Sequence, residues 1–203
     1  MIWGVMAFFA VGVALYAAQY LSFEKTGILF DKGELINRFD WKFAFYCHIA
    51  GGLVALATGA FQFANNDRSK SMTWHQRMGK VYVFSILGPG GLSGLFLAFY
   101  ATGNWVSKTG FALLAISWLI STGQAWRKIR IYDIQAHNDW MIRSYALTFA
   151  AVTLRLWLGI FQGVMEWAFL PSYIVISWLC WVPNLVFAEW FIRRPGRQLE
   201  AVA

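Results

Sequence analysis

Long apolar runs alternate with short polar segments along the whole chain. Six runs, at about 2–22, 41–64, 75–100, 109–126, 138–162 and 169–192, are long enough for helices that cross a bilayer, which takes about 20 residues. The alternating strands of a membrane barrel are absent from the sequence. The pattern predicts an all-α integral membrane protein with one six-helix transmembrane domain over residues 1–203.

The first run resembles a span more than a signal peptide. No Lys or Arg precedes it, whereas a signal peptide has a basic start and a shorter apolar region. The loop 23–40 mixes apolar residues with charges, which is typical of a segment that lies at the membrane interface. We therefore expect six crossings and one amphipathic outer loop.

Composition excludes most other classes of protein. Of 203 residues, 59% are hydrophobic and only 13% are charged, about half the charged fraction of an ordinary soluble domain. The two cysteines, Cys47 and Cys180, lie in apolar runs, which excludes a disulfide framework and a four-thiolate metal site. The net charge of +7 is spread over short clusters without a nucleic-acid-binding motif, so we expect no nucleic acid partner.

The basic residues indicate the topology. With six spans, both termini and the loops 65–74 and 127–137 lie on one side, which gathers eleven Lys and Arg against five on the other. Cytoplasmic loops carry the excess of basic residues, so we expect both termini in the cytoplasm and a multi-pass protein of the bacterial inner membrane. The eleven are Arg68, Lys70, Arg77, Lys80, Arg127, Lys128, Arg130, Arg143, Arg193, Arg194 and Arg197, and the five are Lys25, Lys32, Arg38, Lys42 and Lys108.

Small residues mark the faces on which the helices are expected to meet. A stripe in the second span permits close approach of a neighbour, and its members are His48, Gly52, Ala55, Gly59 and Gln62. The run Gly88-Pro89-Gly90-Gly91 lies inside the third span and predicts a bend there, because Pro breaks the hydrogen-bond ladder of a helix.

Two histidines begin spans that start on the same side. His75 opens the third span and His137 opens the fifth, so their imidazoles are expected at a similar depth. Histidine is a standard axial ligand of haem iron, and Arg77, Lys80 and Arg143 would then suit the propionates. Nearby rings would supply a flat apolar slot, namely Trp74, Tyr82, Trp140 and Tyr145.

Other interpretations of these histidines remain open. Both could be interfacial residues bonded to neighbouring loops, or ligands of another metal. Asp133 and Asp139 flank His137 and could orient its ring, although we favour Asn138 or Asp139 as a helix cap. His48 lies about 10 Å into its span from the opposite side, so we expect an interior hydrogen-bonded residue.

Arg155 is a charged residue inside the fifth span. It follows His137 by eighteen residues, which is five helical turns at 3.6 residues per turn, so the two share a face if the helix is regular. One interpretation is that Arg155 snorkels or bonds backbone carbonyls. The other is that it pairs with an anion: a carboxylate, a propionate or a quinone oxygen.

Two runs carry a resemblance to a known family. W-H-Q-R-M-G-K-V-Y-V, from Trp74, and H-N-D-W-M-I-R-S-Y-A-L-T-F-A-A-V-T-L-R-L-W-L, from His137, resemble a bacterial family of predicted membrane proteins, domain of unknown function 2306. The resemblance covers roughly residues 40–160 and implies no activity. The layout is also loosely similar to cytochrome b and ferric-reductase-like membrane bundles, which implies haem between histidines of different helices. Three histidines are fewer than two haems need.

These observations lead to two main hypotheses. The first is a small membrane redox protein with one haem b between His75 and His137, exchanging electrons with a quinone or a partner. The alternative is a cofactor-free accessory subunit of a larger membrane complex or a homo-oligomer, with Trp178, Trp181 and Trp190 on its lipid- or partner-facing surface. A transporter ranks last, because the chain shows no inverted repeat.

Overall fold

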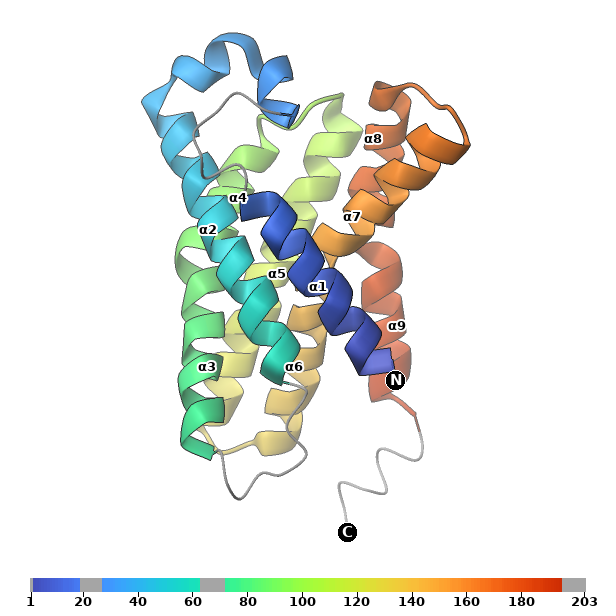
Figure 1. Cartoon of the computed structure of the whole chain (residues 1–203). Helices are drawn as coiled ribbons and strands as arrows, with labels where there is room; N and C mark the ends of the chain where they lie inside the picture. The colour runs from blue at the N-terminus through green and yellow to red at the C-terminus, as the bar shows by residue number, and fades with distance from the viewer. Residues whose placement is uncertain (1, 19–26, 63–71, 195–203) are drawn as a thin grey trace. The chain divides into compact units, whose positions relative to one another are not determined.

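The computed structural model describes residues 2–18, 27–62 and 72–194, and all regular structure within them is helical (Figure 1). The all-α prediction is confirmed for this part of the chain. Its elements are α1 (Ile2–Ala18), η2 (Gly27–Asn37), α2 (Phe39–Gln62), α3 (Met72–Ser85), η3 (Ile86–Gly90), α4 (Gly91–Ala98), α5 (Trp105–Arg130), α6 (Ile134–Thr148), α7 (Ala150–Leu158), η4 (Gly159–Val164), α8 (Phe169–Leu179) and α9 (Val182–Ile192).

Five of the expected spans are confirmed as helical segments long and apolar enough to cross a membrane, in the part of the chain that is described. The first expected span corresponds to α1, whose 17 described residues extend about 26 Å. Its predicted end at residue 22 lies outside the described residues, so a membrane crossing by α1, which would bring the total to six, stays a prediction. The five are Phe39–Gln62, Met72–Ala98, Trp105–Arg130, Ile134–Val164 and Phe169–Ile192.

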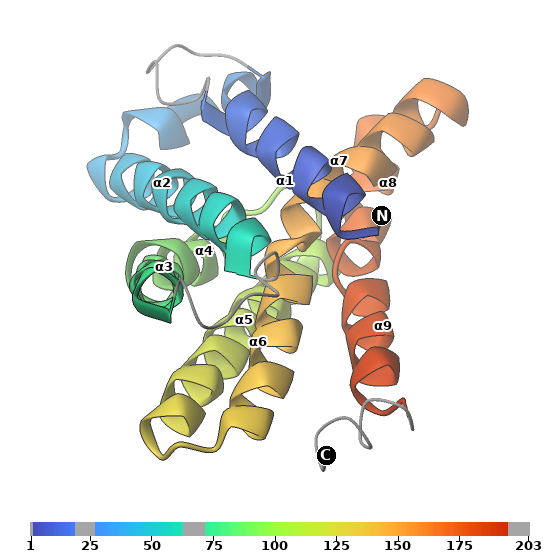
Figure 2. The same ribbon diagram turned by 60° about the horizontal axis from the view of Figure 1, so that its bottom comes forward.

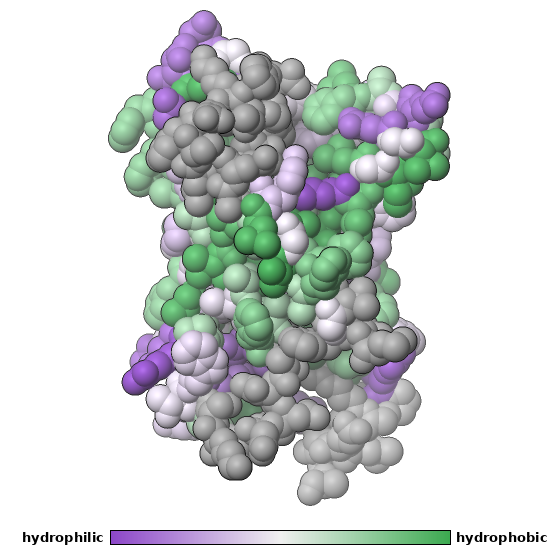
Figure 3. Space-filling model, viewed as in Figure 1, coloured by the Kyte–Doolittle hydropathy of each residue, from purple (hydrophilic) through white to green (hydrophobic). Residues whose placement is uncertain are grey.

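The spans turn apolar side chains outward. Only 28–39% of the most apolar window of each span is buried, and large residues such as Phe43, Phe99 and Val186 are exposed. Figure 3 shows hydrophobic residues over the middle of the helices, while most hydrophilic ones lie toward the helix ends. A surface this apolar is unfavourable in water, so these faces contact the lipid of a bilayer.

The chain divides into two compact units, residues 1–100 and 101–203. In the first unit α2 is central and packs against α1, η2, α3, η3 and α4. In the second unit α5 and α6 lie side by side (Figures 1 and 2), α8 packs on α5 and α7, and α9 packs on α6. The single-domain arrangement expected from the sequence stays a prediction.

The third span departs from a regular α-helix at the Gly-Pro run, where a bend was predicted. The residues Ile86–Gly90 form a π-helical turn that contains Pro89, which has no N–H for the ladder. The backbone of α2 approaches this turn so closely that a Cβ on Gly51 would lie 2.5 Å from the nitrogen of Gly90. The predicted stripe of small residues is therefore displaced by one position at its centre, since Gly52 has open space where Gly51 has none.

The fifth span is less regular than the sequence suggested. The structure divides it into α6, α7 and the π-helical η4, and a single turn residue, Phe149, with φ of −67° and ψ of −11°, joins α6 to α7. The common face expected for His137 and Arg155 stays a prediction.

Candidate functional site

His137 lies in the first turn of α6, four residues after the true helix cap. The side chain of Asp133 accepts a hydrogen bond from the backbone nitrogen of Ala136 at 3.1 Å, which satisfies one of the unpaired N–H groups of the first turn. The predicted cap at Asn138 or Asp139 is therefore wrong. Both residues already belong to the helix, which begins at Ile134.

The imidazole of His137 is oriented by the preceding helix. Its Nδ1 lies 2.8 Å from the carbonyl oxygen of Ala125 on α5. A carbonyl only accepts, so Nδ1 carries the hydrogen and Nε2 holds the lone pair of the neutral ring. Metal-ligating histidines commonly donate their second nitrogen in this way. The ring is half-buried, and Nε2 is the nitrogen that this contact leaves unused.

Asp133 also joins the end of α5 to the start of α6. Lys128 Nζ donates to its carboxylate at 2.9 Å, and this bond, with that from the Ala136 nitrogen, lowers the pKa of Asp133 from its ordinary value of 3.8. Tyr132, with φ of 59°, lies in the left-handed region within the connecting turn. The carboxylate therefore stays charged at neutral pH and fixes the turn that carries His137.

A ladder of buried polar contacts continues from His137 along α5 and α6. The hydroxyls of Thr122 and Ser144 are 2.7 Å apart, and Trp118 Nε1 donates to Thr148 Oγ1 at 2.9 Å. All four side chains are buried. With the His137–Ala125 bond, these contacts fix the register of the two helices, and we call them the α5–α6 ladder.

His75 belongs to the other unit. It lies near the start of α3 and is exposed, as are Arg77 and Lys80. Gln62 Nε2 donates to the carbonyl oxygen of His75 at 3.4 Å, which joins the end of α2 to α3. The structure thus gathers His75, Arg77 and Lys80 in one unit, and the convergence of His75 with His137 stays a prediction.

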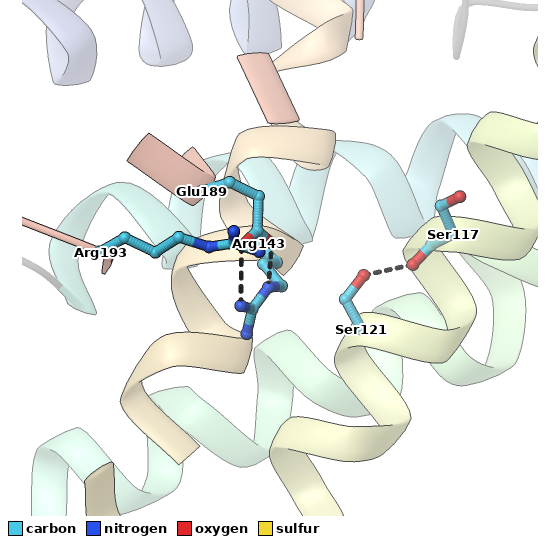
Figure 4. Close-up of polar contacts among 5 residues, drawn as sticks. All are labelled: Ser117, Ser121, Arg143, Glu189 and Arg193. Atoms are coloured by element: carbon cyan, nitrogen blue, oxygen red, sulfur yellow. Dashed lines mark hydrogen bonds and ion pairs between the residues drawn. The ribbon is translucent and has the colours of Figure 1, made fainter. Parts of the chain in front are cut away.

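Arg143 is held by an acidic residue that sequence reasoning missed. Its Nε and Nη2 donate to the carboxylate oxygens of Glu189 on α9 at 2.5 and 3.1 Å (Figure 4), and its guanidinium lies 4.6 Å from the ring centre of Trp140. Glu189 is the one acidic residue within 169–192, and a carboxylate in an apolar span needs a partner. This requirement could have identified Glu189 from the sequence as a residue that needs a basic partner.

Arg155 bonds its own helix. Its Nη1 donates to the carbonyl oxygen of Ala151, one turn earlier in α7, at 2.7 Å. Nearby, Asn184 Nδ2 on α9 donates to Thr153 Oγ1 at 3.1 Å and to the carbonyl of Ala146 at 3.2 Å. The fifth span therefore contains polar contacts that stabilise the second unit. The bond from Arg155 to a backbone carbonyl agrees with one of its two predicted roles.

His48 is hydrogen-bonded in the interior of the first unit, as expected. Its Nδ1 lies 2.8 Å from the carbonyl oxygen of Gly90, in the π-helical turn. The ring rests on Gly94, where a Cβ would come within 2.8 Å of Nδ1. The missing Cβ of Gly94 thus provides the space that the imidazole fills.

The aromatic side chains expected around a haem differ in how far they are exposed. Tyr82 and Tyr145 are core residues, 0% and 6% exposed, whereas Trp74 is 55% exposed. Within residues 2–18, 27–62 and 72–194, no group of three or more His, Cys, Asp or Glu side chains is placed to hold a metal ion. A site with only two histidine ligands has fewer ligands than such a group, so this result does not bear on it.

Comparison with known proteins places the chain in a family. Residues 45–192 match the family described as "Predicted membrane protein (DUF2306)". The chain belongs to the DUF2306 family. The DUF2306 match runs from α2 to the end of α9 and takes in all three histidines, Arg143 and Glu189. No curated protein and no solved structure matches the chain.

Membership of DUF2306 confirms the resemblance noted in the two sequence runs. Together with the five apolar spans, it establishes a membrane protein. The DUF2306 description names no activity, substrate or cofactor, so the function has to be argued from the residues themselves.

Proposed function

We propose that this protein is a small redox protein of the bacterial inner membrane that binds one haem b between His75 and His137. The observation that carries the proposal is the 2.8 Å contact between His137 Nδ1 and the Ala125 carbonyl. It fixes the tautomer and leaves the Nε2 lone pair for iron. Bound haem would supply one-electron chemistry, with a potential that depends on its axial ligands and its burial.

The residues around His137 support a fixed ligand. The charged Asp133 holds the α5–α6 turn. The Thr122–Ser144 contact holds the two helices together further along, seven residues after His137 on α6. A ring anchored at both helices keeps its direction when the iron changes charge. The chain itself thus contributes orientation and a partly buried environment.

The proposal assigns the propionates to Arg77 and Lys80. Both are exposed on α3 close to His75, and cationic groups bind carboxylates strongly. Arg143 already donates two hydrogen bonds to Glu189, and Arg155 bonds the carbonyl of Ala151. In this proposal these two arginines stabilise the second unit and make no propionate contact. A quinone or a membrane partner would exchange the electrons.

The absorption spectrum of the protein purified from haem-supplied cells tests the proposal. We expect a Soret band, one iron per chain, and loss of both in His75→Ala and in His137→Ala. His48→Ala is the matched control and should keep the band, because His48 bonds the carbonyl of Gly90 and is assigned no haem.

Three other results of these measurements would argue against haem binding. A folded protein with no Soret band and no iron contradicts the proposal, as does a band that survives both substitutions. A stoichiometric partner that co-purifies with the iron-free protein would instead favour the accessory-subunit alternative. Of the tryptophans assigned to its surface, Trp190 is 51% exposed, whereas Trp181 is only 7% exposed.

A further inference from the structure

An apolar groove of about 520 Å³ follows one face of α9. Its lining residues recur three and four positions apart, which is the spacing of one side of a helix. From the first to the last of them the groove extends about 18 Å at 1.5 Å per residue. They are Trp181, Val182, Leu185, Val186, Glu189, Trp190 and Arg193.

The groove ends in a cluster of guanidinium groups. Arg193 is exposed, and its Nη2 lies 3.5 Å from Glu189 Oε2 (Figure 4). The guanidinium of Arg194 lies 3.7 Å from the ring centre of Trp190. Because Arg143 already neutralises Glu189 through two hydrogen bonds, the charges of Arg193 and Arg194 give this end a positive potential.

We propose that this groove binds one anionic phospholipid. An acyl chain lies along Val182, Leu185 and Val186, and the phosphate lies between Arg193 and Arg194. α9 is the second half of a membrane span, so the molecules that reach an outward apolar groove are lipids. Trp190 lies near the end of this span, and Trp is enriched where spans meet the headgroups.

Charge selects an anionic lipid over a zwitterionic one. Guanidinium groups bind phosphate through paired hydrogen bonds, and two of them exceed the single charge of a phosphodiester. Phosphatidylcholine adds an ammonium group that this end of the groove repels. Each basic residue near an anionic membrane surface contributes about 1 kcal/mol, or about five-fold in affinity, so two arginines predict a preference of about 25-fold.

Lipid retention measured by native mass spectrometry tests this site. The purified protein is mixed with phosphatidylglycerol or phosphatidylcholine, and we expect one phosphatidylglycerol to be retained per chain. The double variant R193Q/R194Q should lose about 25-fold in affinity for phosphatidylglycerol. The control R127Q/R130Q removes the same charge from two exposed arginines of α5 and should retain the lipid.

A second pair of variants separates the groove from the charge. Val186→Trp fills the groove and keeps both arginines, so it should reduce retention of phosphatidylglycerol. Phe187→Trp is its control, since Phe187 is 61% exposed and lies outside the groove lining. Equal retention of the two lipids, equal loss in both double variants, or unchanged retention in Val186→Trp would overturn the assignment. So would dimers of the chain that Val186→Trp dissociates without changing lipid binding.

Discussion

At Gly51 the backbone of α2 lies directly against the π-helical turn η3. A Cβ at this position would lie 2.5 Å from the nitrogen and 2.7 Å from the Cα of Gly90, and 2.7 Å from the oxygen of Ser85. All three are backbone atoms, which no side-chain rotation can move away. The π-helical turn and α2 therefore pack as they do because residue 51 has no side chain.

The substitution Gly51→Ala should destabilise the protein, while Gly52→Ala should not. The added methyl group forces α2 and η3 apart, and overpacking of this kind costs about 1–3 kcal/mol. Gly52 is the adjacent position on the same helix, with nothing within 4 Å of a new Cβ. The thermal midpoint of unfolding in detergent, followed by circular dichroism, measures both effects.

Equal midpoints for the two alanine variants would show that the contact between α2 and the π-helical turn is looser than the structure has it. A fall for Gly52→Ala alone would mean that the register of α2 is wrong by one residue.

Residue-level prediction from the sequence succeeded for types of residue and failed for partners. The stripe of small residues pointed to close packing of the second span, but its tightest member is Gly51 rather than Gly52. Which of two adjacent glycines meets a neighbour depends on the rotation of the helix, and an irregular turn in the partner sets that rotation. For the same reason Arg143 could be recognised as a cation suited to a carboxylate, while its partner Glu189 was missed.

At the scale of the elements, the α5–α6 ladder explains why these two helices form the core of the second unit. Their contacts repeat at intervals of three to seven residues: Ala125 with His137, Thr122 with Ser144, and Trp118 with Thr148. In lipid the hydrophobic effect does not distinguish a neighbouring helix from acyl chains, so hydrogen bonds and close packing hold helices together.

Removing the middle contact of the ladder should weaken the second unit. Thr122→Val and Ser144→Ala each lose the 2.7 Å hydroxyl contact, and we expect each to lower the free energy of unfolding by about 0.5–2 kcal/mol. The double variant should show a coupling energy of about 0.6 kcal/mol, as is usual for polar contacts between membrane helices. Unfolding in mixed micelles, followed by circular dichroism, gives all three values.

Thr109→Val is the control for this cycle. Thr109 lies on the same helix, but its hydroxyl bonds carbonyls of its own turn and is exposed. This variant should change stability by less than about 0.5 kcal/mol. Additive effects of Thr122→Val and Ser144→Ala would show that the two hydroxyls do not interact.

The elements themselves were predictable, while their ends and breaks were not. Hydropathy identified five spans because about twenty apolar residues in sequence have few other uses. The fifth span was predicted to begin at residue 138, four residues after the start of α6 at Ile134, because residues 127–137 contain charges and were interpreted as a loop. Asp133 caps this helix, and Asn138 and Asp139, a few residues later, are of the same capping type. The turn residue Phe149, between α6 and α7, has no neighbouring Pro or Gly that would have indicated it.

At the scale of the whole molecule, the sequence predicted a membrane protein and a candidate pair of histidines. The pairing itself could not be derived, because it depends on how two compact units, 1–100 and 101–203, meet in the membrane. Periodicity describes the faces of single helices and carries no information on that arrangement. The assignment of His137 as a ligand stays a prediction, and the structure shows only that its Nδ1 lies 2.8 Å from the carbonyl oxygen of Ala125 on the preceding helix.

The topology is the remaining prediction at this scale, and it depends on α1. The 17 described residues of α1 extend about 26 Å, slightly less than the hydrocarbon thickness of about 30 Å. If α1 crosses, the start of α1 and the α5–α6 turn lie on the same side. If it lies on the surface instead, its start shares a side with the loop before α5. The eleven basic residues against five favour the cytoplasm for the α5–α6 turn.

Labelling of single cysteines with a membrane-impermeant thiol reagent distinguishes these arrangements. In a chain with Cys47 and Cys180 replaced by Ala, we expect Asn104→Cys to react in intact spheroplasts. Tyr132→Cys and Gly4→Cys should react only after the membrane is permeabilised. Reaction of Gly4→Cys in intact spheroplasts, with Tyr132→Cys still protected, would reduce the count to five crossings. Reaction of Tyr132→Cys in intact spheroplasts would show that the orientation is the reverse of the predicted one. The excess of basic residues would then not determine the orientation.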